Sequence, residues 1–434
     1  MGTAMEVTDQ STTPAPSHRK PSPRRLDTES RSKHLRAMAQ LERCLRDTRS
    51  NRTARRFAQP RIAVAIPVCN EVERIIHCVD SLSAQQDRYG QPLAAGVLRV
   101  VLLTNGCSDG TYQVVLDHLE RWRAGVTMFD VSLPLTQRNA GYARHLVNHA
   151  ALDLLPSTGG LLFMTDADSC APPHWVSTYA PMLRSGYDVV MGCVDLRPDD
   201  CPELLITLKR RGELEDHYTR LLDRLECLID PIPHDPWPRH FSASGANIAM
   251  RVEALQTIAD FPRPASSEDK LLARMLEAGG CRLRHDCETK IHTSGRLFGR
   301  AAGGMADTLR TRLRVPNAPC DERLECADQA YFRARLRRAL RDVFGAIVTT
   351  KADVMATLSA FDMDTDDLLW DAECDTFEAF WQRLEHSHPR LRRLGITPVR
   401  LVAEIERAQQ LLILVGQSFA RGRTASPEER VQVA

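Results

Sequence analysis

The sequence predicts an α/β fold: a mostly parallel, Rossmann-like central sheet with helices on both faces, followed by a helical extension. Between about residues 60 and 300, short apolar runs alternate with segments of helical spacing, which is typical of βαβ units. Beyond about residue 310 the strand pattern ends and only helical spacing remains. We therefore expect three parts: a basic, unstructured tail with one short helix over 1–58, an α/β domain over 59–310 and helices over 311–434.

Short runs rich in Val, Ile and Leu predict the strands, as suits a parallel sheet that is buried on both faces. The first run begins at residue 62, where the basic tail gives way to apolar residues. In chain order the predicted strands are 62–68, 98–103, 126–131, 161–164, 189–196 and 247–250. Residues 282–285 and 290–292 are also expected to be extended.

Segments with apolar residues three and four apart predict the helices between these strands. Within the α/β part they are 73–83, 112–122, 140–154, 202–228, 252–259 and 266–278. The clearest is 266–278, whose apolar face consists of Leu271, Leu272, Met275 and Leu276. In the extension we expect helices at 334–349, 375–385 and 398–420, and in the tail one near 32–46.

Composition excludes several classes of protein. The 57 basic and 56 acidic residues nearly cancel, so the net charge gives no attraction to nucleic acid. The apolar run 411–415 is too short to cross a bilayer, and the N-terminus has no apolar signal core. None of the 13 cysteines forms a C-x-x-C pair, which indicates reduced thiols. We expect a cytoplasmic protein with no transmembrane segment; peripheral membrane contact through the basic tail remains open.

Two carboxylates mark the end of the fourth predicted strand. The buried run 161–164 is followed by Thr165-Asp166-Ala167-Asp168. Ligands gather at the carboxyl ends of parallel strands, and side chains two apart in extended chain point the same way. Asp166 and Asp168 therefore could both face one hard cation, Mg²⁺ or Mn²⁺. The alternative is an ordinary turn at a strand end, where Asp is common.

The residues after the first predicted strand exclude three nucleotide-binding classes. The chain reads Pro67-Val68-Cys69-Asn70-Glu71, without the G-x-G-x-x-G fingerprint of dehydrogenases. The P-loop pattern G-x-x-x-x-G-K-[ST] occurs nowhere in the sequence. The glycine-rich basic loop that a sugar nucleotidyltransferase places after its first strand is also missing.

Five motifs between about residues 61 and 300 resemble, in order, those of glycosyltransferase family 2, which has the GT-A fold. They are Pro67 to Glu71, similar to Pro-x-x-Asn-Glu; Asn105 to Thr111, similar to Asp-Asp-x-Ser-x-Asp-Gly-Thr; Asn139 to Arg144; Asp166 to Asp168; and Ser267 to Asp269. Asn105 departs from the family's base-contacting aspartate. An amide donates as well as accepts hydrogen bonds, so the identity of the base stays open.

The resemblance implies that a nucleotide-diphosphate sugar binds at these strand ends. The residues expected to contact this donor are Pro67, Asn70, Glu71, Asn105, Arg144, Asp166, Arg296 and Arg300. Arg296 and Arg300 lie in a Gly-rich segment and supply charge for a diphosphate. For Asn70 and Glu71 the alternative is capping of the next helix. For Arg144 the alternative is an exposed position on a helix.

The resemblance also assigns the metal and the catalytic base. Asp168 is expected to hold Mg²⁺ or Mn²⁺, with His292 completing the metal shell or, alternatively, serving only the structure. Asp269 matches the family's catalytic position, where a carboxylate takes the proton of the acceptor hydroxyl. The alternative for this carboxylate is pairing with the helix dipole.

Three residues are expected on the acceptor side. They are Gly245, Asn247 and Glu268, of which Gly245 allows the backbone to approach the sugar closely. The resemblance thus implies a metal-dependent, bacterial-type enzyme that transfers a sugar from a nucleotide-diphosphate donor to an acceptor hydroxyl with inversion. Two alternatives stay open: a retaining transferase acting on a small acceptor such as a glycerate, and a non-catalytic nucleotide-sugar-binding scaffold.

Overall fold

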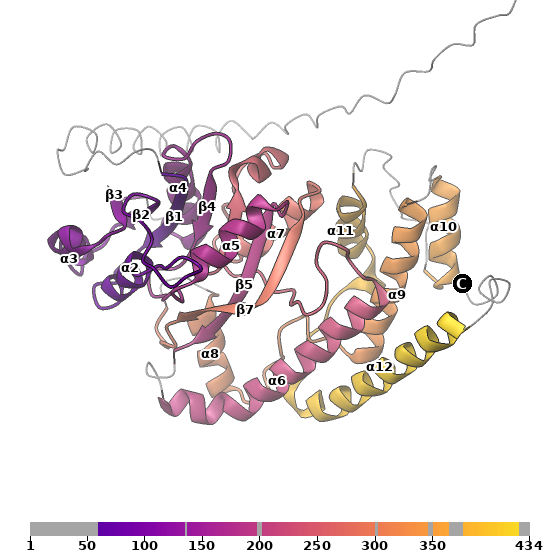
Figure 1. Cartoon of the computed structure of the whole chain (residues 1–434). Coiled ribbons are helices and arrows are strands. Elements are labelled where there is room, and N and C mark those ends of the chain that lie inside the picture. The colour runs from indigo at the N-terminus through magenta and orange to yellow at the C-terminus, as the bar shows by residue number, and fades with distance from the viewer. Residues whose placement is uncertain are drawn as a thin grey trace, which may run out of the picture.

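A seven-stranded sheet flanked by helices forms one side of the molecule, and a group of helices forms the other (Figure 1). The computed structural model describes residues 60–424, except for 135–136, 198–201, 300–302, 346–349 and 364–375. The helix predicted near 32–46 lies outside the described residues. The predicted α/β fold with a mostly parallel sheet is confirmed.

The sheet has the strand order β3-β2-β1-β4-β6-β5-β7. Its strands are β1 (Ile62–Val68), β2 (Leu98–Asn105), β3 (Gly125–Val131), β4 (Leu161–Met164), β5 (Val189–Leu196), β6 (Ile248–Arg251) and β7 (Leu283–Thr293). β1 pairs in parallel with β2 and β4, whereas β6 runs antiparallel to both β4 and β5. The carboxyl ends of β1, β2 and β4 therefore lie side by side, and the start of β6 lies next to them.

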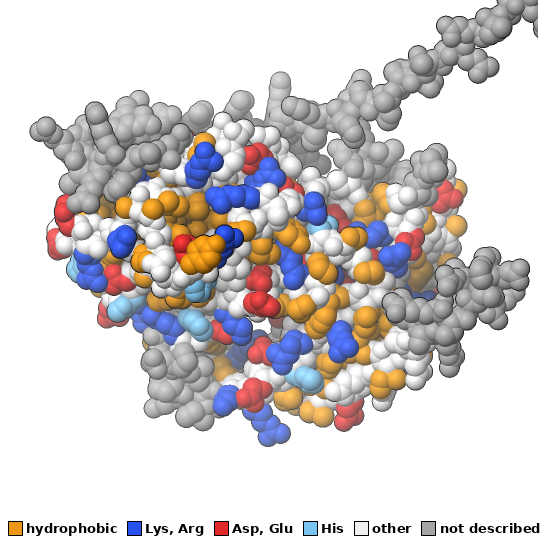
Figure 2. Space-filling model, viewed as in Figure 1, with side chains coloured by type: hydrophobic (Ala, Val, Ile, Leu, Met, Phe, Trp, Pro, Cys, Tyr) orange, Lys and Arg blue, Asp and Glu red, His pale blue; other side chains and the backbone are white. Residues whose placement is uncertain are grey.

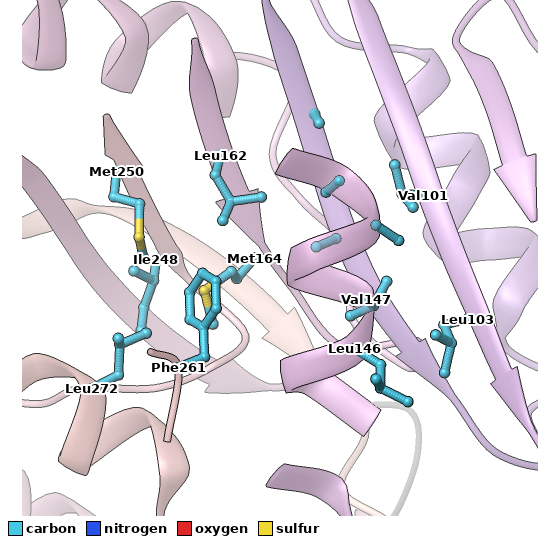
Figure 3. Close-up of a cluster of buried hydrophobic side chains, with 14 of the residues drawn as sticks. Val101, Leu103, Leu146, Val147, Leu162, Met164, Ile248, Met250, Phe261 and Leu272 are labelled. Carbon is cyan, nitrogen blue, oxygen red and sulfur yellow. The ribbon is translucent and has the colours of Figure 1, made fainter. Parts of the chain in front are cut away.

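Helices cover both faces of the sheet. α4 (Ala140–Leu152) and α7 (Glu268–Ala278) pack on one face, and Figure 3 shows Leu146 and Val147 of α4 in that layer. On the other face lie α2 (Ile75–Ser83), α3 (Thr111–His118) and α5 (Trp175–Arg184). Alternate residues along β1 serve the two faces, as the period of a strand requires.

The remaining helices build two further apolar clusters. They are α6 (Pro202–Ile229), α8 (Met305–Arg314), α9 (Ala327–Phe344), α10 (Lys351–Ala360), α11 (Phe377–Ser387) and α12 (Leu401–Thr424). One cluster joins α6 and α12 to the start of α9, and Figure 1 shows α6 and α12 running side by side. The other joins α9, α10 and α11. The division predicted near residue 310 stays a prediction, and α6, which precedes it, shares a core with α12.

The predicted strands are confirmed, whereas several helices differ. The segment 252–259 forms only a 3₁₀ helix, η4 (Val252–Thr257), and α9 begins before its predicted start. α5 was not predicted because Pro181 lies inside it, and proline normally breaks a helix. α8 and α10 were not predicted either. Leu271, assigned to the apolar face of α7, is 41% exposed.

The two extended pieces near the end of the α/β part are one strand, β7. A register shift between Gly192 and Cys193 of β5 absorbs the residues between the pieces. Within the described residues, no helix is long and apolar enough to cross a membrane. Figure 2 shows acidic and basic side chains interspersed over the visible face, in keeping with the balanced charge of the chain.

Candidate active site

The loops after β1 and β2 are tied together by hydrogen bonds. Asn70, with a φ of 55°, accepts a hydrogen bond from the Ser108 amide on its Oδ1 at 2.8 Å. The Glu71 amide donates to Thr111 Oγ1 at 2.9 Å, and the Val72 amide donates to Asp109 Oδ2 at 3.1 Å. Asp109 thus orders the turn. A positive φ is strained in a residue other than glycine, and Asn70 keeps it because these hydrogen bonds fix the surrounding loops.

Two of the residues predicted to contact the donor lie within the sheet. Asn105, at the end of β2, is buried and its Oδ1 accepts from the Leu133 amide at 3.2 Å. Its side-chain oxygen therefore joins the ends of β2 and β3. Pro67 lies in β1, paired with Leu103. Contact of either residue with the donor stays a prediction.

Arg144 of α4 joins the Asp166 loop to α7. Its Nη2 donates to Asp166 Oδ1 at 2.5 Å and its Nε to Glu268 Oε1 at 2.9 Å. Burial alone would lower the pKa of Arg144, but the two carboxylates raise it above its ordinary value. Arg144 is 5% exposed, so the alternative of an exposed helical arginine is wrong.

Gly245 lies against this arginine. A Cβ at position 245 would stand 2.7 Å from Arg144 Nη2, and the Gly245 carbonyl accepts from Nη1 at 3.1 Å. The space left by the missing side chain is therefore filled by the guanidinium. The expectation that a sugar needs this space finds no support in the geometry.

Asn247 is fully buried beneath the site. Its Oδ1 accepts from the indole of Trp175 at 2.8 Å, and its Nδ2 donates to the carbonyls of Cys193 and Thr289. These bonds join α5, β5 and β7. The contacts give Asn247 a structural role, and its predicted contact with an acceptor has no support in them.

Arg296 brings Glu71 and Asp168 together across the sheet edge. Its two terminal nitrogens donate to the two Glu71 oxygens at 2.6 and 2.5 Å, a bidentate pair. Nη2 also lies 3.1 Å from Asp168 Oδ2. Burial raises the pKa of Asp168 to about 6, the Asp166 charge adds to the shift, and Arg296 opposes it.

The residue of β7 that faces Asp168 is Thr293. Its hydroxyl donates to Asp168 Oδ1 at 3.2 Å. His292, one position earlier, is exposed, and its backbone pairs with Cys170. Because neighbouring residues of a strand point to opposite faces, the geometry gives His292 no part in the Asp168 cluster. Arg300 lies outside the described residues.

Asp269 and Glu268 point in different directions from the first turn of α7. Glu268 is buried against Arg144, whereas Asp269 is half-buried and accepts from the Gly245 amide on its Oδ2 at 2.9 Å. The preceding residue, Ser267, is left-handed, with a φ of 60°. Asp269 is thus held next to the buried pair of Arg144 and Glu268, in a position that is partly open to solvent.

Two parts of this arrangement were not predicted from the sequence. The Thr293 hydroxyl was missed, although the alternation of β7 would have placed residue 293 on the inner face. The pairing of Arg296 with Glu71 was also missed, because the two residues lie 225 positions apart. No local pattern in a sequence indicates a contact of that range.

Residues 63–256 match the family model described as "Glycosyl transferase family 2". The search of curated proteins finds no match to this chain.

Several solved structures are similar over most of the chain, with low identity. Staphylococcus aureus TarS 1-349 in complex with UDP is 13% identical, with a TM-score of 0.35, over 71% of this chain and 72% of that one. TarS 1-349 with UDP-GlcNAc is 14% identical, with a TM-score of 0.38, over 83% and 92%. The mannosyltransferase PcManGT from Pyrobaculum calidifontis, in complex with GDP-Man and Mn²⁺, is 14% identical, with a TM-score of 0.40, over 93% of both chains. Because every TM-score is below 0.5, these similarities establish nothing about the ligands of this chain.

Proposed function

Because residues 63–256 form a glycosyltransferase family 2 domain, we propose that this enzyme moves a sugar from a nucleotide-diphosphate donor to an acceptor hydroxyl with the help of a divalent cation. The observation that carries the proposal is the cluster at the carboxyl ends of β1 and β4. Four carboxylates and two guanidinium groups contact one another there: Glu71, Asp166, Asp168, Glu268, Arg144 and Arg296.

The charges of this cluster suit a divalent cation. Two of the four carboxylates are matched by the two arginines, which leaves two negative charges when all four are ionised. Asp166 and Asp168 supply hard oxygen ligands of the kind that Mg²⁺ and Mn²⁺ prefer, so these two side chains would hold the ion. Such an ion offsets charge on a leaving diphosphate.

Arg296 is placed to act on the same diphosphate. It already lies beside Asp168, and a guanidinium binds phosphate oxygens in the same bidentate way in which it holds Glu71. Arg144 has a different part, because it is buried and fully engaged by Asp166, Glu268 and Gly245. It fixes the position of Asp166 relative to α7 and is a positioning residue.

Asp269 is the proposed general base. Backbone amides donate to both of its oxygens, at 2.9 Å from Gly245 and 2.8 Å from Lys270, and hold the carboxylate in place at the start of α7. In a direct displacement the acceptor oxygen bonds to the anomeric carbon as the bond from that carbon to the diphosphate oxygen breaks. The proton of the acceptor hydroxyl goes to Asp269, and the configuration at the anomeric carbon inverts.

A thermal-shift screen tests the donor and the cation together. UDP- and GDP-sugars are added with and without Mn²⁺ to the wild-type protein and to Asp168→Asn. We expect at least one nucleotide sugar to raise the melting temperature of the wild type in the presence of Mn²⁺, because a ligand that binds only the folded state stabilises it. In the Asp168→Asn variant, the increase in melting temperature that depends on Mn²⁺ should be lost. Equal shifts in both proteins would remove Asp168 from the cation site.

A further inference from the structure

A second group of potential metal ligands lies behind the carboxylate cluster, on α4. His145 and His149 are one helical turn apart and face Asp260, in the segment between η4 and α7. His149 Nε2 lies 2.8 Å and His145 Nδ1 3.6 Å from Asp260 Oδ1. One ligand atom from each residue lies within 4.8 Å of the other two. Among the described residues this is the only such group of three or more His, Cys, Asp and Glu side chains.

The ligand types favour a transition metal. Neutral imidazole nitrogens suit Zn²⁺ and its neighbours in the first row, whereas Mg²⁺ and Ca²⁺ take oxygen ligands. Two imidazoles and one carboxylate form a common three-residue ligand set for Zn²⁺, with water in the fourth position. Side chains at i and i+4 share one helix face, so both imidazoles can reach the same ion.

The group combines burial with a path to solvent. The His145 side chain is fully buried, while those of His149 and Asp260 are 28% and 24% exposed. A metal ion could therefore reach the group from solvent along His149 and Asp260, while His145 completes the site from inside the fold.

The surroundings hold the three side chains in place. Asp260 Oδ1 also accepts from the Phe261 amide at 2.8 Å. His145 Nδ1 lies 3.3 Å from the Phe261 carbonyl, a contact that this nitrogen would give up on binding an ion. Phe261 itself is anchored in the apolar layer under α4 (Figure 3). Arg263 lies 3.8 Å from Oδ2, the carboxylate oxygen turned away from the imidazoles. An ion at Oδ1 would take the place of the hydrogen bond between Oδ1 and His149 Nε2.

We propose that His145, His149 and Asp260 bind one transition-metal ion of the Zn²⁺ class, at a site separate from the Mg²⁺ or Mn²⁺ site at Asp166 and Asp168. The ion would tie the segment after η4 to α4. That segment leads into Glu268 and Asp269, and α4 carries Arg144 next to His145. The site is therefore a positioning device for the base and for the arginine that holds Asp166.

Cobalt is the probe for this site, because Co²⁺ substitutes for Zn²⁺ and absorbs visible light according to its ligands. Apo-protein is titrated with CoCl₂, and the two matched variants are His149→Gln and His292→Gln. We expect wild type and His292→Gln to bind one equivalent with the weak visible bands of nitrogen and oxygen ligands. His149→Gln should bind Co²⁺ at least about tenfold more weakly, because losing even a residue that only hydrogen-bonds to a metal ligand weakens metal binding by that factor.

Three results overturn the site. The first is the absence of Co²⁺ bands in the wild type, and the second is an unchanged titration of His149→Gln. The third is a strong near-ultraviolet sulfur-to-cobalt band, which would assign the ion to cysteines. Asp260→Asn, which keeps the shape of the side chain, provides an independent second ligand deletion, and circular dichroism checks that each variant is folded. The assay contains no nucleotide sugar, so its failure leaves the proposed transfer reaction untouched.

Discussion

Asp168 is the carboxylate whose ionisation decides whether a cation can bind. Its pKa is raised to about 6 by burial and by the Asp166 charge, so protons compete with the metal at a higher pH than at an ordinary aspartate. We expect the Mn²⁺-dependent thermal shift with a nucleotide sugar to fall as the pH decreases through about 6, whereas an unperturbed aspartate would keep it down to about pH 4. A shift that stays constant between about pH 7 and pH 5 would contradict this role, since the pKa of Asp168 would then be unperturbed.

Arg296 is the residue that links the β1 loop to the Asp-x-Asp loop. Arg296→Ala removes a bidentate partner from Glu71 and a positive charge from Asp168. We expect the donor KM, measured by slow hydrolysis of the nucleotide sugar, to rise by about tenfold or more, as for a lost charged hydrogen bond. The pH at which half of the Mn²⁺-dependent thermal shift is lost should also rise, because Arg296 lowers the pKa of Asp168.

The control for this variant addresses the carboxylate that it leaves behind. Breaking a buried ion pair is destabilising mainly because one charge remains unpaired. Adding Glu71→Gln should therefore restore part of the melting temperature of Arg296→Ala without restoring the donor KM. If Arg296→Ala alone keeps the wild-type KM, the arginine is structural.

At the scale of elements, the contact between α4 and the segment before β6 depends on a glycine. In Gly245→Ala the new Cβ would stand 2.7 Å from Arg144 Nη2, and the guanidinium is held by three partners. We expect a loss of about 1–3 kcal/mol in the free energy of unfolding, as for overpacking in a core. Gly212→Ala in α6 is the control, because its Cβ meets nothing within 4 Å. Urea denaturation measures both, and equal stability of the two variants would show that Arg144 moves without cost.

Most strands could be predicted because they contain short apolar runs, as in β4, where Leu161, Leu162, Phe163 and Met164 are all buried. The polar residues within β7 divided it into two predicted pieces. The reversed direction of β6 could not be predicted, because periodicity carries no information on strand direction. α5 was hidden by Pro181. In the site, motif order placed Asp166, Asp168, Glu268 and Asp269 at one sheet edge. The roles of Gly245 and Asn247 needed the positions of Arg144 and Trp175, which lie far away in the sequence.

At the scale of the whole molecule, the resemblance predicted from five short motifs is confirmed over residues 63–256, which match the model of glycosyltransferase family 2. The match ends within the α/β part, well before the C-terminal helices. Those helices are nevertheless joined to the α/β part by packing, since Tyr218 and Leu225 of α6 share a core with Leu401 and Leu411 of α12. We infer that the helices stabilise α6 and do not form an independent unit.

Leu411→Ala tests this dependence. Leu411 is 2% exposed and lies between α12 and α6. The free energy of unfolding of the variant should therefore be lower by about 2–5 kcal/mol, as for other substitutions of buried leucine by alanine. Val402→Ala on the same helix is the control, because Val402 is 55% exposed. We expect a single denaturation transition that is shifted as a whole and includes the sheet. It is followed by the fluorescence of Trp175 of α5, which packs on the sheet, in a protein whose other four tryptophans are replaced. A separate early transition that leaves the sheet signal unchanged would show that the helices unfold on their own.

Proton transfer to Asp269 is tested most directly by comparing Asp269→Asn with the wild type. The assay is hydrolysis of the nucleotide sugar that gives the largest Mn²⁺-dependent thermal shift. We expect the variant to keep the donor affinity within about twofold and to lose about a hundredfold or more in kcat, the contribution of a general base. The control is Asp321→Asn, which should keep its kcat. This change removes the carboxylate that lies 3.4 Å from Nζ of Lys270, the residue after Asp269 in α7. Near-wild-type turnover of Asp269→Asn would contradict the inverting mechanism.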